Sequence, residues 1–97
     1  MTSFRILPAA SEELEACVSY YNSQQSNLGT EFLTEFEKTA ERIIELPNAA
    51  RAVGDGIRSR PIHRFPFYVL YRTQAEEITI VAIAHRRRRP RYWVGRK

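Results

Sequence analysis

The sequence predicts an α+β domain in which a helical hairpin packs on one face of a mostly antiparallel, four-stranded sheet. Two successive segments of the first half repeat apolar residues at helical spacing, and Pro47 ends the second of them. From Ile57 to His85 the apolar residues instead alternate with period two. Because 97 residues suffice for one modest core, we expect a single domain over residues 1–97, with the order β-α-α-β-β-β.

The N-terminal part predicts a short strand followed by a helix. Phe4 and Ile6 flank Arg5 in a strand that should end at Pro8. Carboxylates near a helix N-terminus complement its dipole, so a helix start is expected at three glutamates, Glu12, Glu13 and Glu15. The apolar face of this helix comprises Leu14, Cys17, Val18 and Tyr21.

A polar turn from Asn22 to Asn27 should connect this helix to a second one that starts near Gly29. The apolar stripe of the second helix comprises Phe32, Leu33, Phe36, Ala40, Ile43 and Ile44. Two amphipathic helices with a short connector pack as an antiparallel hairpin and present one joint apolar face. We expect that face to cover one side of the sheet, leaving the other side and the tail to carry the arginines.

The remaining strands are expected after a loop at residues 48–56. Ile57 to Arg64 should form a strand that Pro61 restricts to an edge or a bulge. Phe67 to Arg72 follows, and a turn at residues 73–76 leads into the last strand, Glu77 to His85. In that strand Ile78, Ile80, Ala82 and Ala84 alternate with Thr79, Val81 and Ile83. Because both faces are apolar, we expect the last strand to lie centrally.

Charge is divided unevenly along the chain. Residues 1–47 carry three basic and eight acidic side chains, a net charge of −5, whereas residues 48–97 carry twelve basic and three acidic, a net charge of +9. Seven of the fifteen basic residues fall in the last thirteen positions, and no acid lies among them. Such a cluster repels itself, so we expect residues 86–97 to bind an acidic partner rather than to form a frayed tail.

Other features argue against several classes of protein. Cys17 is the only cysteine, which excludes an intramolecular disulfide and fits a cytoplasmic protein; in its apolar stripe it should act as a small hydrophobe. No segment approaches the ~20 apolar residues of a membrane span, so no membrane role is expected. Asp55 and His63 offer no Ser/His/Asp set. We expect no cofactor and no metal.

Fragments along the whole chain share one order and spacing with a known family. They are Glu13, Tyr20-Tyr21, Leu28-Gly29, Phe32-Leu33, Pro47, Gly56-Ile57-Arg58, Arg64-Phe65-Pro66-Phe67, Val69-Leu70-Tyr71, and Ile83 to Trp93. The chain thereby resembles the RelE/ParE superfamily of toxins from bacterial type II toxin-antitoxin (plasmid stabilisation) systems, on the ParE side. The resemblance implies a RelE/ParE-like fold and a growth-inhibiting toxin. It also implies a cognate antitoxin whose acidic C-terminal segment wraps the toxin.

RelE-like members of the superfamily cut messenger RNA on the ribosome, and this chemistry needs a proton acceptor, a proton donor and cations for the phosphate. The candidates here are His85 as acid or base, Arg64 and Arg86 as phosphate clamps, and Tyr92 as a second proton carrier or stacking platform. Arginine cannot serve as a base. The lysine-rich loop of RelE-like nucleases is missing, since the only lysines are Lys38 and Lys97. We therefore lean against an enzyme.

ParE-like members instead bind and poison DNA gyrase, which requires no acid–base pair. We favour this interpretation because arginine and tryptophan are frequent at binding hot spots. The expected target-binding residues are Arg58, Arg60, Arg64, Arg86, Arg87, Arg88, Arg89, Arg91, Tyr92 and Trp93. Two alternatives remain for function: a ribosome-dependent mRNA endoribonuclease and a non-toxic, basic nucleic-acid-binding domain. Two alternatives also remain for individual side chains. His85 could form only a local hydrogen bond, and Trp93 could pack the tail against the domain.

Overall fold

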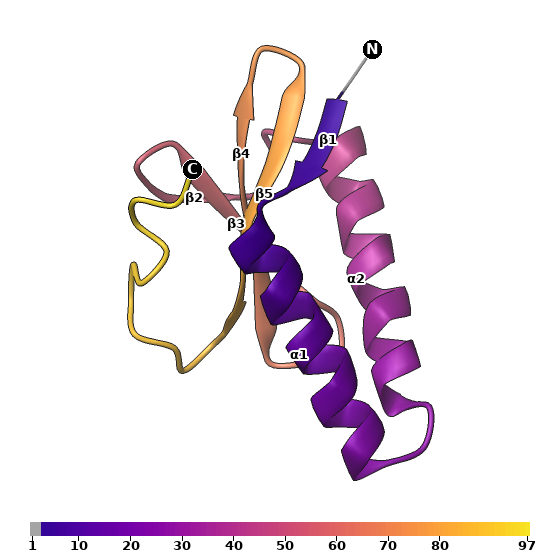
Figure 1. Cartoon of the computed structure of the whole chain (residues 1–97). Coiled ribbons are helices and arrows are strands. Elements are labelled where there is room, and N and C mark those ends of the chain that lie inside the picture. The colour runs from indigo at the N-terminus through magenta and orange to yellow at the C-terminus, as the bar shows by residue number, and fades with distance from the viewer. Residues whose placement is uncertain (1–2) are drawn as a thin grey trace.

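Two helices lie against one face of a five-stranded sheet in the computed structural model, which describes residues 3–97 (Figure 1). The elements are β1 (Ser3–Ile6), α1 (Pro8–Gln24), α2 (Leu28–Glu45), β2 (Arg51–Gly54), β3 (Ile57–Pro61), β4 (Phe67–Gln74) and β5 (Glu77–His85). The strand order is β1-β5-β4-β3-β2; β1 runs parallel to β5 and the other neighbours are antiparallel. The α+β class and the central position of β5 are confirmed.

The strand β2 is the main departure from the expected topology, because residues 48–56 were predicted to form only a loop. Arg51–Gly54 pairs with β3 across a turn at Asp55 and Gly56, whose φ angles are 53° and 73°. Positive φ at both turn residues is typical of the Asp-Gly hairpin turn. The sheet therefore has five strands rather than four. β3 lies inside the sheet and stops at Pro61, which leaves His63 and Arg64 beyond its end.

The first helix begins earlier than its glutamates predict. Pro8 occupies the first turn of α1, where its fixed φ favours helix and its missing N–H leaves no bond unmade. No acidic residue lies in that first turn. The prediction that Glu12, Glu13 and Glu15 complement the helix dipole is therefore wrong, and Glu13 has a different role, described below.

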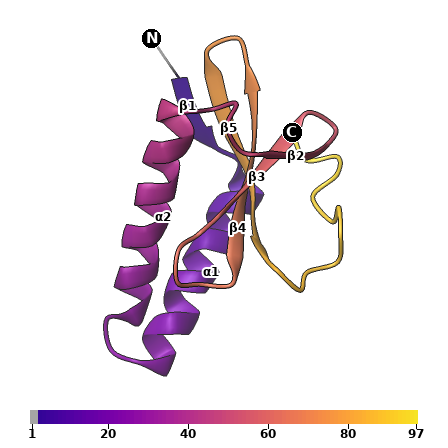
Figure 2. The same cartoon turned by 180° about the vertical axis from the view of Figure 1, so that it is seen from behind.

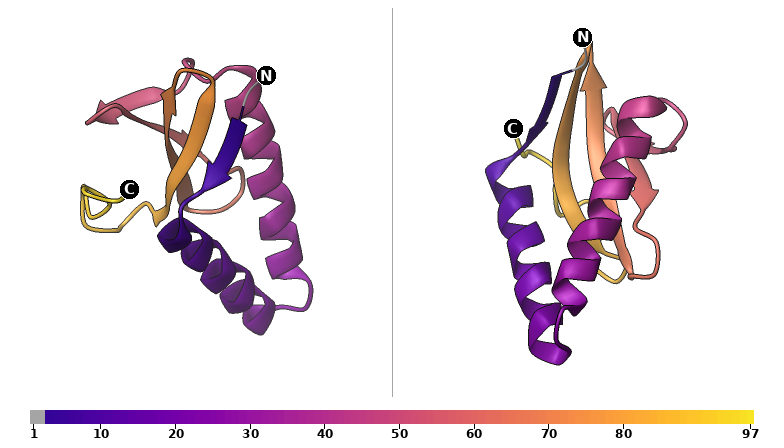
Figure 3. Two further views of the ribbon diagram at one scale, coloured as in Figure 1. Left: turned by 45° about the horizontal axis from the view of Figure 1, so that its top comes forward. Right: turned by 90° about the vertical axis from the view of Figure 1, so that its right-hand side faces the viewer.

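The two helices form the expected antiparallel hairpin, connected at residues 25–27 (Figures 1 and 3). Asn27 adopts a left-handed conformation with φ of 67°, and the side-chain oxygen of Asn22 accepts the N–H of Gly29 at 2.7 Å. A Cβ added at Gly29 would lie 2.1 Å from the carbonyl oxygen of Val18. Glycine at this position therefore allows the helices to approach closely.

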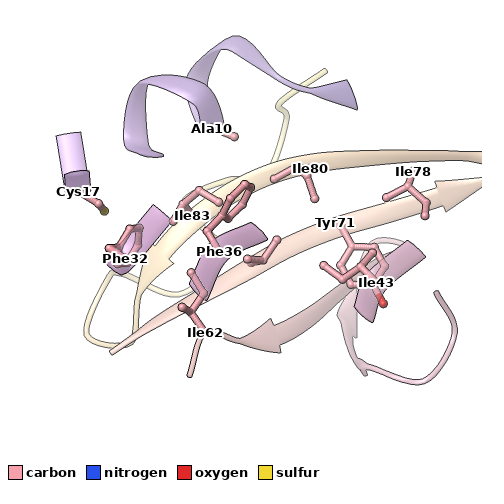
Figure 4. Close-up of a cluster of buried hydrophobic side chains, with 11 residues drawn as sticks. Ala10, Cys17, Phe32, Phe36, Ile43, Ile62, Tyr71, Ile78, Ile80 and Ile83 are labelled. Atoms are coloured by element: carbon pink, nitrogen blue, oxygen red, sulfur yellow. The ribbon is translucent and has the colours of Figure 1, made fainter. Parts of the chain in front are cut away.

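The main core lies between the helices and the sheet (Figure 4). Phe32, Phe36 and Ile43 of α2 meet side chains of β4 and β5 there. Ring contacts reinforce one end, where Tyr21 stacks on Phe32 with centroids 5.4 Å apart. The buried members are Ala10, Cys17, Phe32, Phe36, Ile43, Ile62, Val69, Tyr71, Ile78, Ile80 and Ile83.

A bulge interrupts the alternation of β5. Leu70 pairs with Ala82 and Tyr71 with Ile80, so Val81 has no partner on β4. The predicted alternation holds for Ile78 and Ile80 and then fails: Val81, Ala82 and Ala84 all join a second core on the opposite face of the sheet, whereas Ile83 returns to the helix side. The sequence prediction missed this shift because both faces are apolar.

Substitution of Gly29 by Ala tests the close helix contact. The new methyl group would clash with main-chain atoms of α1, so we expect Gly29→Ala to lower the free energy of unfolding by at least about 1 kcal/mol despite the better helix propensity of alanine. Urea denaturation followed by circular dichroism measures the change. Thr30→Ala, at the exposed neighbouring position, should stay within about 0.5 kcal/mol of wild type. Equal stability of both variants would contradict the close contact.

Candidate functional site

The C-terminal segment, residues 86–97, folds back on the face of the sheet opposite the helices (Figures 1 and 2). Trp93 is only 6% exposed and belongs to the second core. The other buried members of that core are Leu7, Ile57, Leu70, Val81, Ala82 and Ala84, with Val53 and Tyr92 packed against it. Trp93 therefore anchors the segment to the sheet, and its ring does not face a partner. The segment is not a frayed tail.

One carboxylate connects this segment to the helical layer. Glu13 of α1 accepts the Tyr92 hydroxyl at 2.8 Å, two N–H groups of Arg96 at 2.9 and 3.1 Å, and the backbone N–H of Ile83 at 3.0 Å. Arg96 also donates to the carbonyl oxygen of Val81 at 3.0 Å. The contacts of Glu13 join residues 70 to 83 positions apart in the sequence. We call this arrangement the Glu13 clamp.

The clamp provides hydrogen-bond partners for the backbone of β5 beyond the point where β1 ends. β1 pairs with β5 only as far as Ile80, and the chain then turns into α1 at Pro8. The carbonyl of Val81 and the N–H of Ile83 lie beyond that point, and buried backbone groups without partners are costly. Arg96 bonds the carbonyl and Glu13 bonds the N–H. The ion pair thus takes the place of a longer edge strand.

The clamp also determines the protonation of its members. Burial by itself would raise the pKa of Glu13, but the hydrogen bonds from Arg96, Ile83 and Tyr92 outweigh it, so the net shift lowers the pKa. Burial and the bond to Glu13 raise the pKa of Tyr92. Glu13 is therefore an anion that accepts hydrogen bonds, and the phenol proton of Tyr92 is held. Tyr92 is poorly suited to be the proton carrier that was considered for a nuclease.

The remaining nuclease candidates make local or structural contacts. His85 packs edge-on against Phe67 with centroids 5.0 Å apart, and its Nδ1 accepts the N–H of Arg87 at 3.0 Å. Arg64 lies on the other side of the sheet and pairs with Glu31 of α2 at 2.9 Å. Of the four nuclease candidates, His85, Arg86 and Tyr92 border the same hollow and Arg64 does not. The structure therefore does not bring all four together.

The exposed arginines of the C-terminal segment form a first basic surface, the basic loop, which consists of residues 86–91. Arg86, Arg87, Arg88 and Arg89 are exposed, and none of them forms an ion pair with any residue from 3 to 97. Arg91 is paired with Asp55 of the β2–β3 turn. The loop borders a hollow of about 120 Å³ whose floor comprises Ser59, Tyr68, Leu70 and Ala84.

A second surface, of mixed charge, lies on the helix side of the sheet. Arg60 and Arg64 line a groove of about 640 Å³ between α2 and the end of β3, opposite Lys38 and Arg42. Its other lining residues are Glu35, Thr39, Glu41, Glu45, Pro61 and His63. The Nε atom of Arg60 is buried and has no hydrogen-bond partner in the described chain. Arg58 is committed to the carbonyl of Ala50 at 2.8 Å. The expected target-binding set therefore divides between two surfaces.

The remaining groups considered are the cysteine and the possible metal ligands. Cys17 is buried in the main core, and burial raises the pKa of its thiol to about 11, which fits a small hydrophobe rather than a nucleophile. Within residues 3–97, no group of three or more His, Cys, Asp or Glu side chains is gathered to hold a metal ion. No helix in that range is long and apolar enough to cross a membrane.

Comparison with known proteins agrees with this architecture. Residues 4–90 match the family described as the ParE toxin of the type II toxin-antitoxin system parDE. The chain belongs to the ParE toxin family. Its fold is similar to a solved chain of the chromosomal ParDE toxin-antitoxin system from P. aeruginosa, with a TM-score of 0.66 and 22% sequence identity over 88% of this chain and 96% of that one. No curated protein matched the toxin sequence.

The sequence interpretation of this ParE-family toxin missed Glu13 as the organising residue of the site. The family resemblance includes Glu13 and neither Glu12 nor Glu15, which are exposed in the structure, but the sequence assigns Glu13 no role beyond the helix dipole. Its partners become visible only when α1, β5 and the C-terminal segment are placed together. A second signal was the pair of large aromatics, Tyr92 and Trp93, which indicated that the segment must pack against the domain.

Lowering the pH should release the C-terminal segment. Because the folded pKa of Glu13 lies below its unfolded value, its stabilisation is complete above the ordinary carboxyl pKa of about 4.3 and is lost as the pH falls through the folded value. Trp93, the only tryptophan, reports the change, so its emission should shift to longer wavelength in acid.

Matched variants separate Glu13 from the other carboxylates in this measurement. Glu13→Gln should show the long-wavelength emission already at neutral pH. Glu15→Gln, which changes an exposed residue of the same helix, and Asp55→Asn, which breaks the pair with Arg91, should keep the neutral-pH emission of wild type. An unchanged emission spectrum of Glu13→Gln at neutral pH would contradict the clamp.

Proposed function

We propose that this toxin inhibits growth by binding DNA gyrase through the basic loop. The observation that carries the proposal is the set of four exposed arginines without acidic partners, held by the Glu13 clamp and Trp93 on a folded scaffold. Exposed cations in a fixed arrangement favour association with an acidic surface. Two nuclease candidates beside them have local hydrogen bonds, since the Tyr92 hydroxyl donates to Glu13 and Nδ1 of His85 accepts from Arg87, and this favours binding over phosphodiester cleavage.

The expected mode of action is capture of a protein partner at one face. Arginine presents a planar fork of donors that matches a carboxylate, and such contacts contribute strongly when the arginine is already ordered. Backbone bonds order the loop at its start, since Arg86 donates to the Pro66 carbonyl at 2.8 Å and Arg88 to that of His85 at 2.9 Å. The pair between Arg91 and Asp55 orders its end. The cations therefore lose little conformational freedom on binding.

We further propose that a cognate antitoxin neutralises the toxin by placing an acidic segment in the groove beside α2. The buried Nε of Arg60 is a donor without an acceptor, and a native protein rarely leaves such a group unpaired. A carboxylate entering the groove would accept Nε once the Arg60 side chain turns toward it, and it would meet Arg64 and Lys38 as well. The segment would have to avoid Glu35, Glu41 and Glu45, which line the same groove. The antitoxin and the target would then contact different faces of the sheet.

Loss of basic-loop charges should weaken the action on gyrase. Arg88→Ala combined with Arg89→Ala should raise the toxin concentration that half-inhibits supercoiling by purified gyrase at least tenfold, which is about 1.4 kcal/mol of binding. Arg5→Ala combined with Arg51→Ala removes the same charge from exposed positions elsewhere and should leave inhibition within twofold. Wild-type toxin that leaves supercoiling intact but cleaves transcripts in a translating extract would overturn the gyrase proposal in favour of the ribonuclease.

The antitoxin contact is tested with a substitution that keeps charge. Arg60→Lys preserves the cation and removes Nε, so we expect it to weaken antitoxin binding at least fivefold in calorimetry, using the antitoxin encoded beside this toxin. Arg51→Lys, at an exposed position of β2, serves as the control and should bind like wild type. Unchanged affinity of Arg60→Lys, with an unchanged melting curve, would exclude Arg60 as the contact.

A further inference from the structure

One arginine of the basic loop differs from its neighbours in how it is held. The guanidinium carbon of Arg88 lies 4.3 Å from the centroid of the Tyr92 ring. Arg86, Arg87 and Arg89 make no such ring contact within the described chain. A guanidinium stacked on an aromatic ring keeps its N–H edges available for a ligand while its position is restricted. Arg88 is thus the most ordered unpaired cation of the loop.

The ring that carries Arg88 is itself fixed from the helical layer. The Tyr92 hydroxyl donates to Glu13, and Arg96, which pairs with the same carboxylate, places its guanidinium carbon 4.9 Å from the ring centroid. Two arginines therefore share one aromatic ring, but Glu13 compensates the charge of only one of them. Arg96 is neutralised inside the clamp, and Arg88 keeps its full charge at the surface.

The hollow beside Arg88 favours a carboxylate on a short side chain. Its lining combines apolar atoms of Leu70 and Ala84 with the polar side chains of Ser59 and Tyr68, in a volume of about 120 Å³. The methylene groups of Asp or Glu suit the apolar floor, and the carboxylate suits the planar fork of Arg88. A nucleic-acid backbone instead requires an open groove with repeated phosphate contacts. The geometry therefore favours an acidic protein segment over a nucleic acid.

We infer that Arg88 is the principal carboxylate contact of the basic loop and that Glu13 is its positioning residue, acting through the Tyr92 ring. This inference rests on the proposed function, because it assigns the contact within the surface proposed to bind the target. It goes further because Glu13, a residue of α1 on the other side of the sheet edge, would fix the position of Arg88 at the binding surface. The helical layer and the binding loop are thereby coupled through one aromatic ring.

A double-substitution experiment with a peptide probe tests the assignment. The probe is a fluorescein-labelled octaglutamate peptide, and its affinity is measured by fluorescence anisotropy at one fixed salt concentration. Arg88→Ala should weaken binding at least fivefold, and Arg87→Ala, an equally exposed neighbour, less than twofold. Arg88→Lys should bind like Arg88→Ala, because an ammonium lacks the planar fork. Equal losses for Arg87→Ala and Arg88→Ala would overturn the assignment of Arg88.

The positioning role has its own outcome in the same experiment. Tyr92→Phe keeps the ring and the pair between Glu13 and Arg96 but removes the bond that fixes the ring to Glu13. It should weaken the peptide severalfold in the wild-type background and have no further effect in Arg88→Ala, whereas its effect should persist in Arg87→Ala. Effects that simply add in the variant that combines Tyr92→Phe with Arg88→Ala would overturn the positioning role of Glu13.

Two further arms keep this inference separate from the proposed function. Stronger binding of a 20-base-pair DNA duplex than of the peptide, with the same dependence on Arg88, would overturn the choice of a carboxylate partner. If wild-type toxin fails to inhibit gyrase but the peptide affinities of the variants follow the pattern expected above, the gyrase target is rejected and the Arg88 contact is supported. Gyrase inhibition that is insensitive to Arg88→Ala would reject the contact and support the target.

Discussion

The carboxylate of Glu13 holds together three parts of the chain that no other single group connects in the described structure. It bonds the bulged strand β5 through Ile83, the aromatic ring of Tyr92 and the cation of Arg96. A partly buried carboxylate is stable only when its lone pairs are used, and here four hydrogen bonds use them. The orientation of the C-terminal segment on the second core depends on this arrangement.

The clamp explains how a strongly basic segment can remain folded. Like charges close together destabilise a compact state, and only some cations of the segment form ion pairs within the fold. Arg96 is neutralised by Glu13 and Arg91 by Asp55, while Trp93 and Tyr92 bury apolar surface against the sheet. The remaining arginines, residues 86–89, are left for partners. Structure and binding are therefore divided between different residues of one short segment.

The sequence was sufficient for the features that depend on periodicity. The helical stripes, the end of α2 before Pro47 and the central position of β5 follow from local apolar patterns, and they are confirmed. Two features failed for different reasons. The bulge at Val81 is invisible when both faces of a strand are apolar. The strand β2 was missed although its Asp-Gly turn is a local hairpin signal, because the residues before that turn include few β-formers.

The site was predicted only in part because its contacts join residues that lie far apart in the sequence. A count of charges finds the basic loop, because charge is a property of composition. It cannot assign Arg60 and Arg64 to the groove beside α2, or Arg58 to the carbonyl of Ala50, because that requires knowing which face of β3 and of the following turn each side chain occupies. It also cannot distinguish Glu13 from Glu12, since the partners of Glu13 lie at the other end of the chain.

Hydrogen exchange of the backbone amides tests most directly whether the clamp holds the C-terminal segment on the sheet. Exchange of amides in residues 81–97 is compared between wild type and Glu13→Gln, with α2 as the internal reference. Loss of the clamp should accelerate exchange at Ile83 and through residues 86–97 while the amides of α2 remain protected, because the main core does not involve Glu13. Equal protection of the segment in both proteins would contradict the clamp.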